Sequence, residues 1–150
     1  MEYTTKILIA DENPSFRSSL RENLIRMGYC NIEEAANGEE TLLKMAHFYP
    51  DIVIMDVWLS KLDGIGVLRS SHTLDWGQEK EPSFILLSSV SNRNLFIEAT
   101  EAGAALCLLK PVNLTSLCEH IQSFSVGRKK PNAVAAAAIL PSDHVPDIES

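Results

Sequence analysis

The sequence has few cysteines, more acidic than basic residues, and no hydrophobic stretch long enough to cross a membrane. Its three cysteines are an odd set without the spacing of a metal site, so we expect reduced thiols rather than disulfides or a zinc centre: Cys30, Cys107 and Cys118. A run of about 20 apolar residues and a signal peptide are both lacking, which predicts a cytoplasmic protein without membrane contact. The formal net charge of -7 disfavours binding of this segment to the phosphates of nucleic acids.

The 150 residues suffice for one domain, and a regular alternation of strand and helix patterns runs through most of them. Four strand patterns are wholly apolar and one is more polar; in order they are 6–10, 31–36 (the polar one), 52–56, 84–87 and 105–109. Helical patterns lie between and after them, with cap residues at Asn13, Asn37 and Asn113. Such alternation requires parallel strands and right-handed crossovers. We predict an α/β fold, a doubly wound five-stranded parallel sheet of order 2-1-3-4-5, the flavodoxin-like (βα)5 arrangement, with strand 31–36 at an edge.

Composition divides the chain into a domain and a tail. Residues 71–82 are polar and predict a long exposed connection between a short helix and the strand 84–87. From residue 127 the chain becomes rich in alanine, proline and polar residues, with little apolar periodicity. We therefore predict a domain at residues 1–126 and a flexible linker or tail at 127–150, leading to an output domain that these residues do not contain.

The most informative stretch is 52–56, four apolar residues that run directly into Asp56. A continuous apolar run of this length is typical of a strand buried on both faces. Polar residues follow the ends of other strands in the same way: Asp11 and Glu12, Ser88, and Lys110. Because parallel strands end at one edge of the sheet, we expect these groups to meet there. Three crowded carboxylates repel each other unless a cation lies among them, which predicts a Mg²⁺ or Mn²⁺ site.

Residues 6–125 resemble the receiver domain of response regulators, the phosphorylated half of two-component signalling. The resemblance depends on five elements in the correct order: Asp11-Glu12, Asp56, Asp63-Gly64, Ser88 and Lys110-Pro111. It implies that Asp56 accepts a phosphoryl group from a sensor histidine kinase or a phosphotransfer protein. It also implies a signalling switch rather than an enzyme, one that regulates transcription through an effector domain absent from these residues.

The same resemblance assigns a role to each site residue. Mg²⁺ would be held by Asp11, Glu12, Asp56 and the backbone carbonyl of Trp58, and Lys110 would pair with a phosphoryl oxygen. Ser88 would donate a hydrogen bond to the phosphoryl group and draw its loop along. This movement would change the surface formed by the helix at 92–101, the strand 105–109 and the last helix. By analogy, that surface could also support a homodimer, and the Lys110-Pro111 peptide would be cis.

The sequence departs from the receiver pattern at four places. Leu59-Ser60 stands where receivers often have Met-Pro, and Ser88 replaces the more usual Thr while keeping a hydroxyl donor. Trp58 is bulky, and it either shields an acyl phosphate from water or only packs on its loop. Cys107 occupies the position of an aromatic residue that swings between buried and exposed states, a movement that a thiol cannot reproduce.

Two further classes of protein compete with this interpretation. A receiver-like interaction module that works without phosphorylation is favoured by Cys107 and opposed by the intact acidic pocket. A phosphatase of the haloacid dehalogenase type carries the motif Asp-x-Asp after its first strand. Here the residue two positions after Asp56 is Trp58, and the residue two positions after Asp11 is Asn13, so the motif is not matched at either place. A flavodoxin would need a phosphate loop rich in Ser and Thr after the first strand, and the sequence does not have one.

Overall fold

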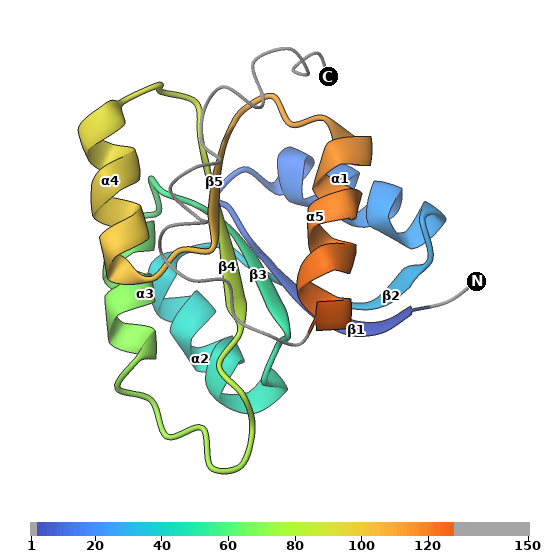
Figure 1. Ribbon diagram of the computed structural model, residues 1–150, viewed down its shortest axis with the longest axis horizontal. Helices are drawn as coiled ribbons and strands as arrows, with labels where there is room; N and C mark the ends of the chain where they lie inside the picture. The colour runs from blue at the N-terminus through green and yellow to red at the C-terminus, as the bar shows by residue number, and fades with distance from the viewer. Residues whose placement is uncertain (1–2, 128–150) are drawn as a thin grey trace.

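Five parallel strands form the central layer of the computed structural model, which describes residues 3–127 (Figure 1). They are β1 (Tyr3–Ala10), β2 (Tyr29–Ala35), β3 (Ile52–Asp56), β4 (Ser83–Ser88) and β5 (Leu106–Leu109). Their order in the sheet is β2-β1-β3-β4-β5, and all four pairings are parallel. The predicted doubly wound sheet is therefore confirmed, with the polar strand β2 at an edge.

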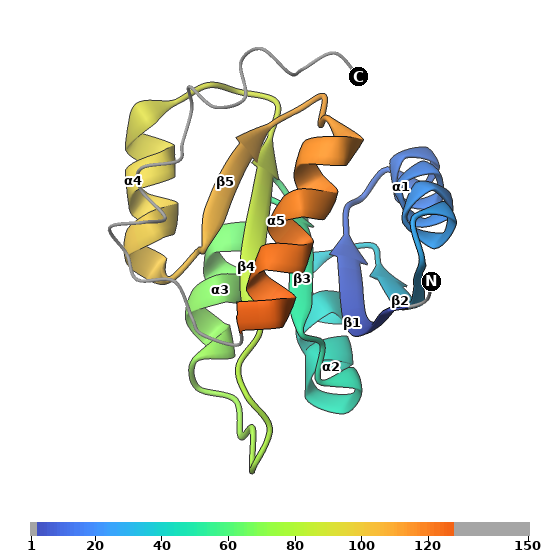
Figure 2. The same ribbon diagram turned by 45° about the vertical axis from the view of Figure 1, so that its right-hand side comes forward.

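Helices cover both faces of this sheet, as Figures 1 and 2 show. One face carries α1 (Pro14–Arg26) and α5 (Leu114–Gly127); the other carries α2 (Gly38–Phe48), α3 (Gly64–Ser71) and α4 (Arg93–Ala102). Alternate residues of each strand enter separate apolar clusters on the two faces of the sheet. Ile54 lies in the cluster on the side of α1 and α5, and Val53 and Met55 lie in the cluster on the side of α2, α3 and α4. Burial on both faces explains why the strands read as continuous apolar runs.

Asparagine caps fix where the helices begin. The side chain of Asn13 accepts hydrogen bonds from the N–H groups of Ser15 and Phe16 at the start of α1. Three other asparagines cap α2, α4 and α5 in the same way: Asn37, Asn92 and Asn113. The predicted caps are thus confirmed. Because the caps at Asn13, Asn92 and Asn113 follow strand ends, they set the length of loops at the carboxyl edge of the sheet.

The first two strands begin earlier than the sequence predicts. β1 starts at Tyr3 rather than residue 6, and β2 starts at Tyr29 rather than residue 31. The rings of Tyr3 and Tyr29 stack with centroids 4.4 Å apart, and the two residues are partners in the strand register. This cross-strand contact extends the pairing beyond the apolar pattern.

The connection at residues 71–82 is not wholly exposed, which corrects the prediction. The side chain of Trp76 is buried, its indole N–H donates to the carbonyl oxygen of Ser71 at 3.0 Å, and its ring meets that of Tyr49 edge-on. A large amphipathic ring therefore pins this connection to the core. At the other end of the domain, α5 reaches Gly127, and the rest of the predicted tail lies outside the described residues.

None of the helices within residues 3–127 has both the length and the apolar character needed to cross a membrane.

The first residue of α2 contacts the loop that follows β3. The N–H of Gly38 donates to the carbonyl oxygen of Ser60 at 3.1 Å, and a Cβ atom at Gly38 would overlap the carbonyl oxygen of Leu62. Gly66, in α3, differs because a Cβ there would meet side-chain atoms, the nearest being a methyl carbon of Leu62 at 2.7 Å and the next residue being Asp63, with Oδ1 at 3.3 Å. Of these two glycines, Gly38 is the one at which a Cβ atom would meet backbone atoms.

We expect Gly38→Ala to lower the free energy of unfolding by about 2 kcal/mol, because the β3–α3 loop must move away from the added methyl group. Gly66→Ala is the matched control and should change it by less than about 1 kcal/mol, since the helix propensity of alanine offsets the small repacking. Urea unfolding followed by circular dichroism measures both values. Equal effects of the two substitutions would contradict the proposed contact.

Candidate functional site

Three of the predicted residues meet at the carboxyl edge of the sheet. The Lys110 Nζ atom lies 2.7 Å from Asp11 Oδ2 and 2.7 Å from Asp56 Oδ2. The exposed fractions of the three side chains are 19%, 5% and 14%, so this cluster of charges is largely removed from water. One ammonium group thus neutralises part of the charge of two acids that the sequence places 45 residues apart.

The backbone of the sheet sets this arrangement. Asp11 directly follows β1 and its N–H donates to Ala35 of β2, while Lys110 directly follows β5 and its N–H donates to Ser88 of β4. Asp56 is the last residue of β3, between them. The ladder of hydrogen bonds therefore continues into the site and holds all three residues at one edge. The Lys110-Pro111 peptide is cis, as the resemblance implied.

The charge on Lys110 is favoured by its surroundings. Burial alone would lower the pKa of Lys110, but hydrogen bonds and charge interactions with Asp11 and Asp56 outweigh burial and raise the pKa above its ordinary value. The ammonium group also lies 4.2 Å from the centre of the Phe16 ring. A cation–π contact of this kind adds to the stabilisation of the charged form.

Each acid uses its second carboxylate oxygen to order the loop that follows it. Asp56 Oδ1 accepts from the N–H of Trp58 at 2.8 Å, and Asp11 Oδ1 accepts from the N–H of Asn13 at 2.9 Å. The carboxylates are therefore fixed in orientation by their own backbone. Their remaining oxygens both contact the Lys110 ammonium group.

Glu12 is directed elsewhere. Its carboxylate accepts a hydrogen bond from the backbone N–H of Ser60, in the loop after β3. Within residues 3–127, no group of three or more His, Cys, Asp and Glu side chains is arranged to hold a metal ion. The converging oxygens of Asp11 and Asp56 still suit a hard divalent cation, which takes carboxylate, backbone carbonyl and water oxygens together.

Ser88 is buried at the end of β4, the strand that pairs with β3. Its hydroxyl group donates to the carbonyl oxygen of Val90 at 2.9 Å and accepts from the N–H of Val90 at 3.0 Å. In this arrangement the hydroxyl stabilises its own loop. The structure thus brings the predicted residue to the correct strand end, with its hydrogen bonds directed toward the loop that leads to α4.

Comparison with known proteins identifies the family. The response regulator receiver domain matches residues 7–122. This chain belongs to the response regulator receiver family. It is 28% identical over 116 residues to the chemotaxis protein CheY of Bacillus subtilis, covering 77% of this chain and 93% of that protein. It is also 34% identical over 118 residues to ycf27 of Pyropia yezoensis, a probable transcriptional regulator, covering 79% of this chain and 46% of that protein.

Solved structures agree with this family. The chemotaxis response regulator CheY4 of Vibrio cholerae superposes with a TM-score of 0.71 at 26% identity, over 81% of this chain and 98% of that chain. A receiver domain protein of Methanospirillum hungatei superposes with a TM-score of 0.75 at 26% identity, over 85% of this chain and 98% of that chain. The predicted fold and the predicted resemblance are both confirmed.

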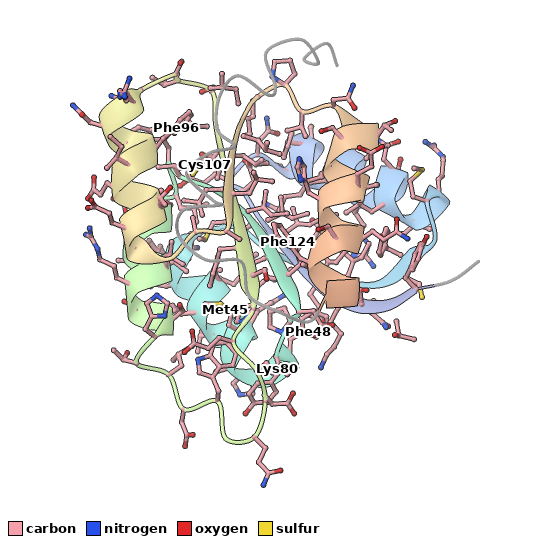
Figure 3. All side chains as sticks on the ribbon, viewed as in Figure 1. Met45, Phe48, Lys80, Phe96, Cys107 and Phe124 are labelled. Carbon is pink, nitrogen blue, oxygen red and sulfur yellow. The ribbon has the colours of Figure 1, made fainter. Side chains whose placement is uncertain are left out.

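This receiver domain has a buried thiol at the position expected for the switch aromatic. The Cys107 side chain is 5% exposed and belongs to the same apolar cluster as Phe96 of α4; Figure 3 shows both between α4 and β5. Burial raises the pKa of Cys107 to about 12. The thiol is therefore a neutral core group in this receiver domain.

Sequence patterns did not identify Arg17, which contacts the backbone of Asp11. An Arg17 Nη atom donates to the carbonyl oxygen of Asp11 at 2.6 Å, and its Nε atom pairs with Glu34 of β2 at 2.9 Å. This arginine lies on α1, where its spacing marks only a polar face. One indication of the Arg17–Glu34 ion pair is present in the sequence, which is the polar character of β2.

We expect one of the three thiols to react quickly with Ellman's reagent at pH 8. Cys30 is exposed, whereas Cys107 and Cys118 are buried and burial raises the pKa of both, which keeps them as unreactive thiols. Fast release of one equivalent of thionitrobenzoate, abolished by Cys30→Ser, is the expected result. Any fast equivalent in the folded Cys30→Ser variant would show that Cys107 or Cys118 is accessible.

Proposed function

We propose that this receiver domain is a phosphorylation-dependent signalling switch and that Asp56 is its phosphoacceptor. The observation that carries the proposal is the pairing of Lys110 with Asp56 and Asp11 at 2.7 Å, at the carboxyl edge of the sheet. The phosphoryl donor is a histidine kinase or a phosphotransfer protein, in keeping with the family. The domain receives and loses a phosphoryl group and is not otherwise an enzyme.

In the proposed reaction, an Asp56 carboxylate oxygen attacks the phosphorus atom of the donor. The new O–P bond forms as the bond from phosphorus to the phosphohistidine nitrogen breaks, and the histidine leaves with the electron pair. Lys110 stays protonated, as its raised pKa requires, and exchanges its ion pair with Asp56 for one with a phosphoryl oxygen. The Trp58 N–H holds the second carboxylate oxygen and keeps the attacking oxygen directed at the donor.

The oxygen ligands at this edge suit Mg²⁺ or Mn²⁺. Asp11, Asp56, Glu12 and the backbone carbonyl of Trp58 are the groups that would hold it. When bound, the cation neutralises charge on the transferring oxygens. Asp11 is already fixed for this task by Asn13, because one of its oxygens accepts from that N–H and the other faces Lys110.

The proposed switch is a change of partner at Ser88. To donate to a phosphoryl oxygen, the hydroxyl must leave the carbonyl oxygen of Val90, which frees the β4–α4 loop. This loop leads directly to Asn92, the cap of α4. A new contact at Ser88 therefore biases the surface formed by α4, β5 and α5. The proposal gives no moving role to Cys107, because that thiol is packed in the core.

The burial of Cys107 also favours a second candidate, an interaction module that binds its partner without phosphorylation. A domain without the swinging aromatic could present one fixed α4–β5–α5 surface. The two candidates differ in whether the site forms an adduct and whether the adduct changes α4, so the experiments below distinguish them.

The output of the switch is proposed from the relatives alone. The chain spans about half the length of the ycf27 protein, whose name describes a probable transcriptional regulator. We propose that an effector domain regulating transcription follows this receiver domain in a longer protein. We also propose that the domain forms a homodimer through α4, β5 and α5 and that the protein is cytoplasmic. The effector domain, and not this acidic domain, would bind nucleic acid.

Incubation with acetyl phosphate and Mg²⁺ should add one phosphoryl group to the protein, measured as intact mass. Asp56→Asn should abolish the adduct, because an amide oxygen does not form the acyl phosphate. Asp63→Asn is the matched control: Asp63 caps α3 through the N–H of Gly66, a role that asparagine also fills, so its adduct should be unchanged.

Chelation by EDTA should prevent the same adduct, since the carboxylates then lack their cation. An adduct that persists in Asp56→Asn, or that forms equally well in EDTA, would contradict the proposed site. No adduct in the unchanged protein would favour the interaction module.

Ser88→Ala should still form the adduct but should lose most of its effect on α4. A hydrogen bond to a charged group contributes about 1.5–3 kcal/mol. Its loss therefore lowers the equilibrium constant for the active arrangement by about tenfold or more. Hydrogen exchange of residues 89–102, before and after acetyl phosphate, measures this effect. Ser88→Thr should retain the change, and equal changes in Ser88→Ala and the unchanged protein would exclude the hydroxyl as the switch.

A further inference from the structure

Ser60 is held between two parts of the domain by its backbone. Its N–H donates to the Glu12 carboxylate in the β1–α1 loop, and its carbonyl oxygen accepts from the N–H of Gly38 at the start of α2. The same carbonyl also accepts from the N–H of Leu62, at 2.7 Å. The β3–α3 loop, which carries the exposed Trp58, is therefore anchored on one side by Glu12 and on the other by α2.

The Glu12 anchor exists only because residue 60 is not proline. Proline has no backbone N–H and cannot donate a hydrogen bond. The serine at this position therefore supplies a donor that a Met-Pro sequence would remove. The structure therefore has an additional hydrogen bond across the site at this position.

The charges around the site indicate that Glu12 has two competing partners. Asp11 and Asp56 already share the Lys110 ammonium group, which leaves their site one negative charge in excess. Glu12 instead faces a neutral N–H group, and its side chain is exposed and long enough to rotate. A divalent cation held by Asp11 and Asp56 attracts this third carboxylate more strongly than a backbone N–H does.

We propose that Glu12 is a positioning residue that exchanges between the Ser60 N–H and the cation site, so that cation binding releases the β3–α3 loop. This inference rests on the proposed function, because it requires Asp11 and Asp56 to bind the cation. Coupling of this kind is reciprocal: a change that removes the Ser60 N–H donor and keeps the Glu12 carboxylate also strengthens cation binding.

The decisive comparison is Ser60→Pro against Ser60→Ala, titrated with MgCl₂ and followed by tryptophan fluorescence and calorimetry. Trp58 reports on the loop, while Trp76 is buried in the α3–β4 connection. Ser60→Ala keeps the N–H donor and should bind Mg²⁺ like the unchanged protein. Ser60→Pro removes the donor and should bind Mg²⁺ roughly fivefold more tightly, since Glu12 no longer has to leave a partner.

A double-mutant cycle tests whether Glu12 carries this effect. Glu12→Ala should weaken Mg²⁺ binding by roughly fivefold or more, and in that background Ser60→Pro should no longer tighten it. Equal Mg²⁺ affinities of Ser60→Pro and Ser60→Ala would overturn the exchange alone. If the unchanged protein binds no Mg²⁺, the proposed function and the exchange are both overturned.

A metal-free measurement covers the case in which Ser60→Pro does not fold. Glu12→Ala removes the acceptor and should increase acrylamide quenching of Trp58, because the loop loses one anchor. Glu12→Gln keeps an amide oxygen that accepts from the Ser60 N–H, and its quenching should stay close to that of the unchanged protein. Unchanged quenching in Glu12→Ala would show that the hydrogen bond does not hold the loop.

Discussion

The ammonium group of Lys110 between two carboxylates is the interaction on which the site depends. The carboxylates of Asp11 and Asp56 both lie within hydrogen-bond distance of Lys110, and they would repel each other without this positive charge between them. The contacts at 2.7 Å require three strands to end at one edge of the sheet, with the β5 end placed to reach across β4 and β3. The sheet order is therefore a condition for the chemistry as well as for the fold.

This cluster of charges contributes little to the stability of the domain. Removing charges from water has a cost that their mutual attraction only partly offsets, so a largely buried ion pair is a weak source of stability. Stability comes instead from the two apolar clusters on either side of the sheet, to which β1, β3 and β4 contribute on both faces. Such a core can hold a cluster of charged side chains at the edge of its sheet.

Much of the fold follows from local patterns in the sequence, and the places where prediction was incomplete have a common cause. Apolar strands and asparagine caps are properties of neighbouring residues, so β3 and the start of α1 could be predicted. The early start of β2 at Tyr29, the burial of Trp76 against Tyr49 and the direction of Glu12 each depend on a partner distant in sequence. The meeting of Asp11, Asp56 and Lys110 could be predicted because the sequence indicates where the strands end. The hydrogen-bond partners of these residues could not be predicted from the sequence.

The departures from the receiver pattern affect different parts of the mechanism. Cys107 removes a moving ring from the route between the site and the α4–β5–α5 surface, while Ser60 adds a hydrogen bond between the site and the β3–α3 loop. Neither residue touches the Asp11–Lys110–Asp56 cluster. Under the proposed function, phosphoryl acceptance is kept while its transmission differs: less depends on a side chain in the core and more on loops whose hydrogen bonds change partners. Ser88 and Glu12 are the two side chains in position to make such exchanges, one on each side of Asp56.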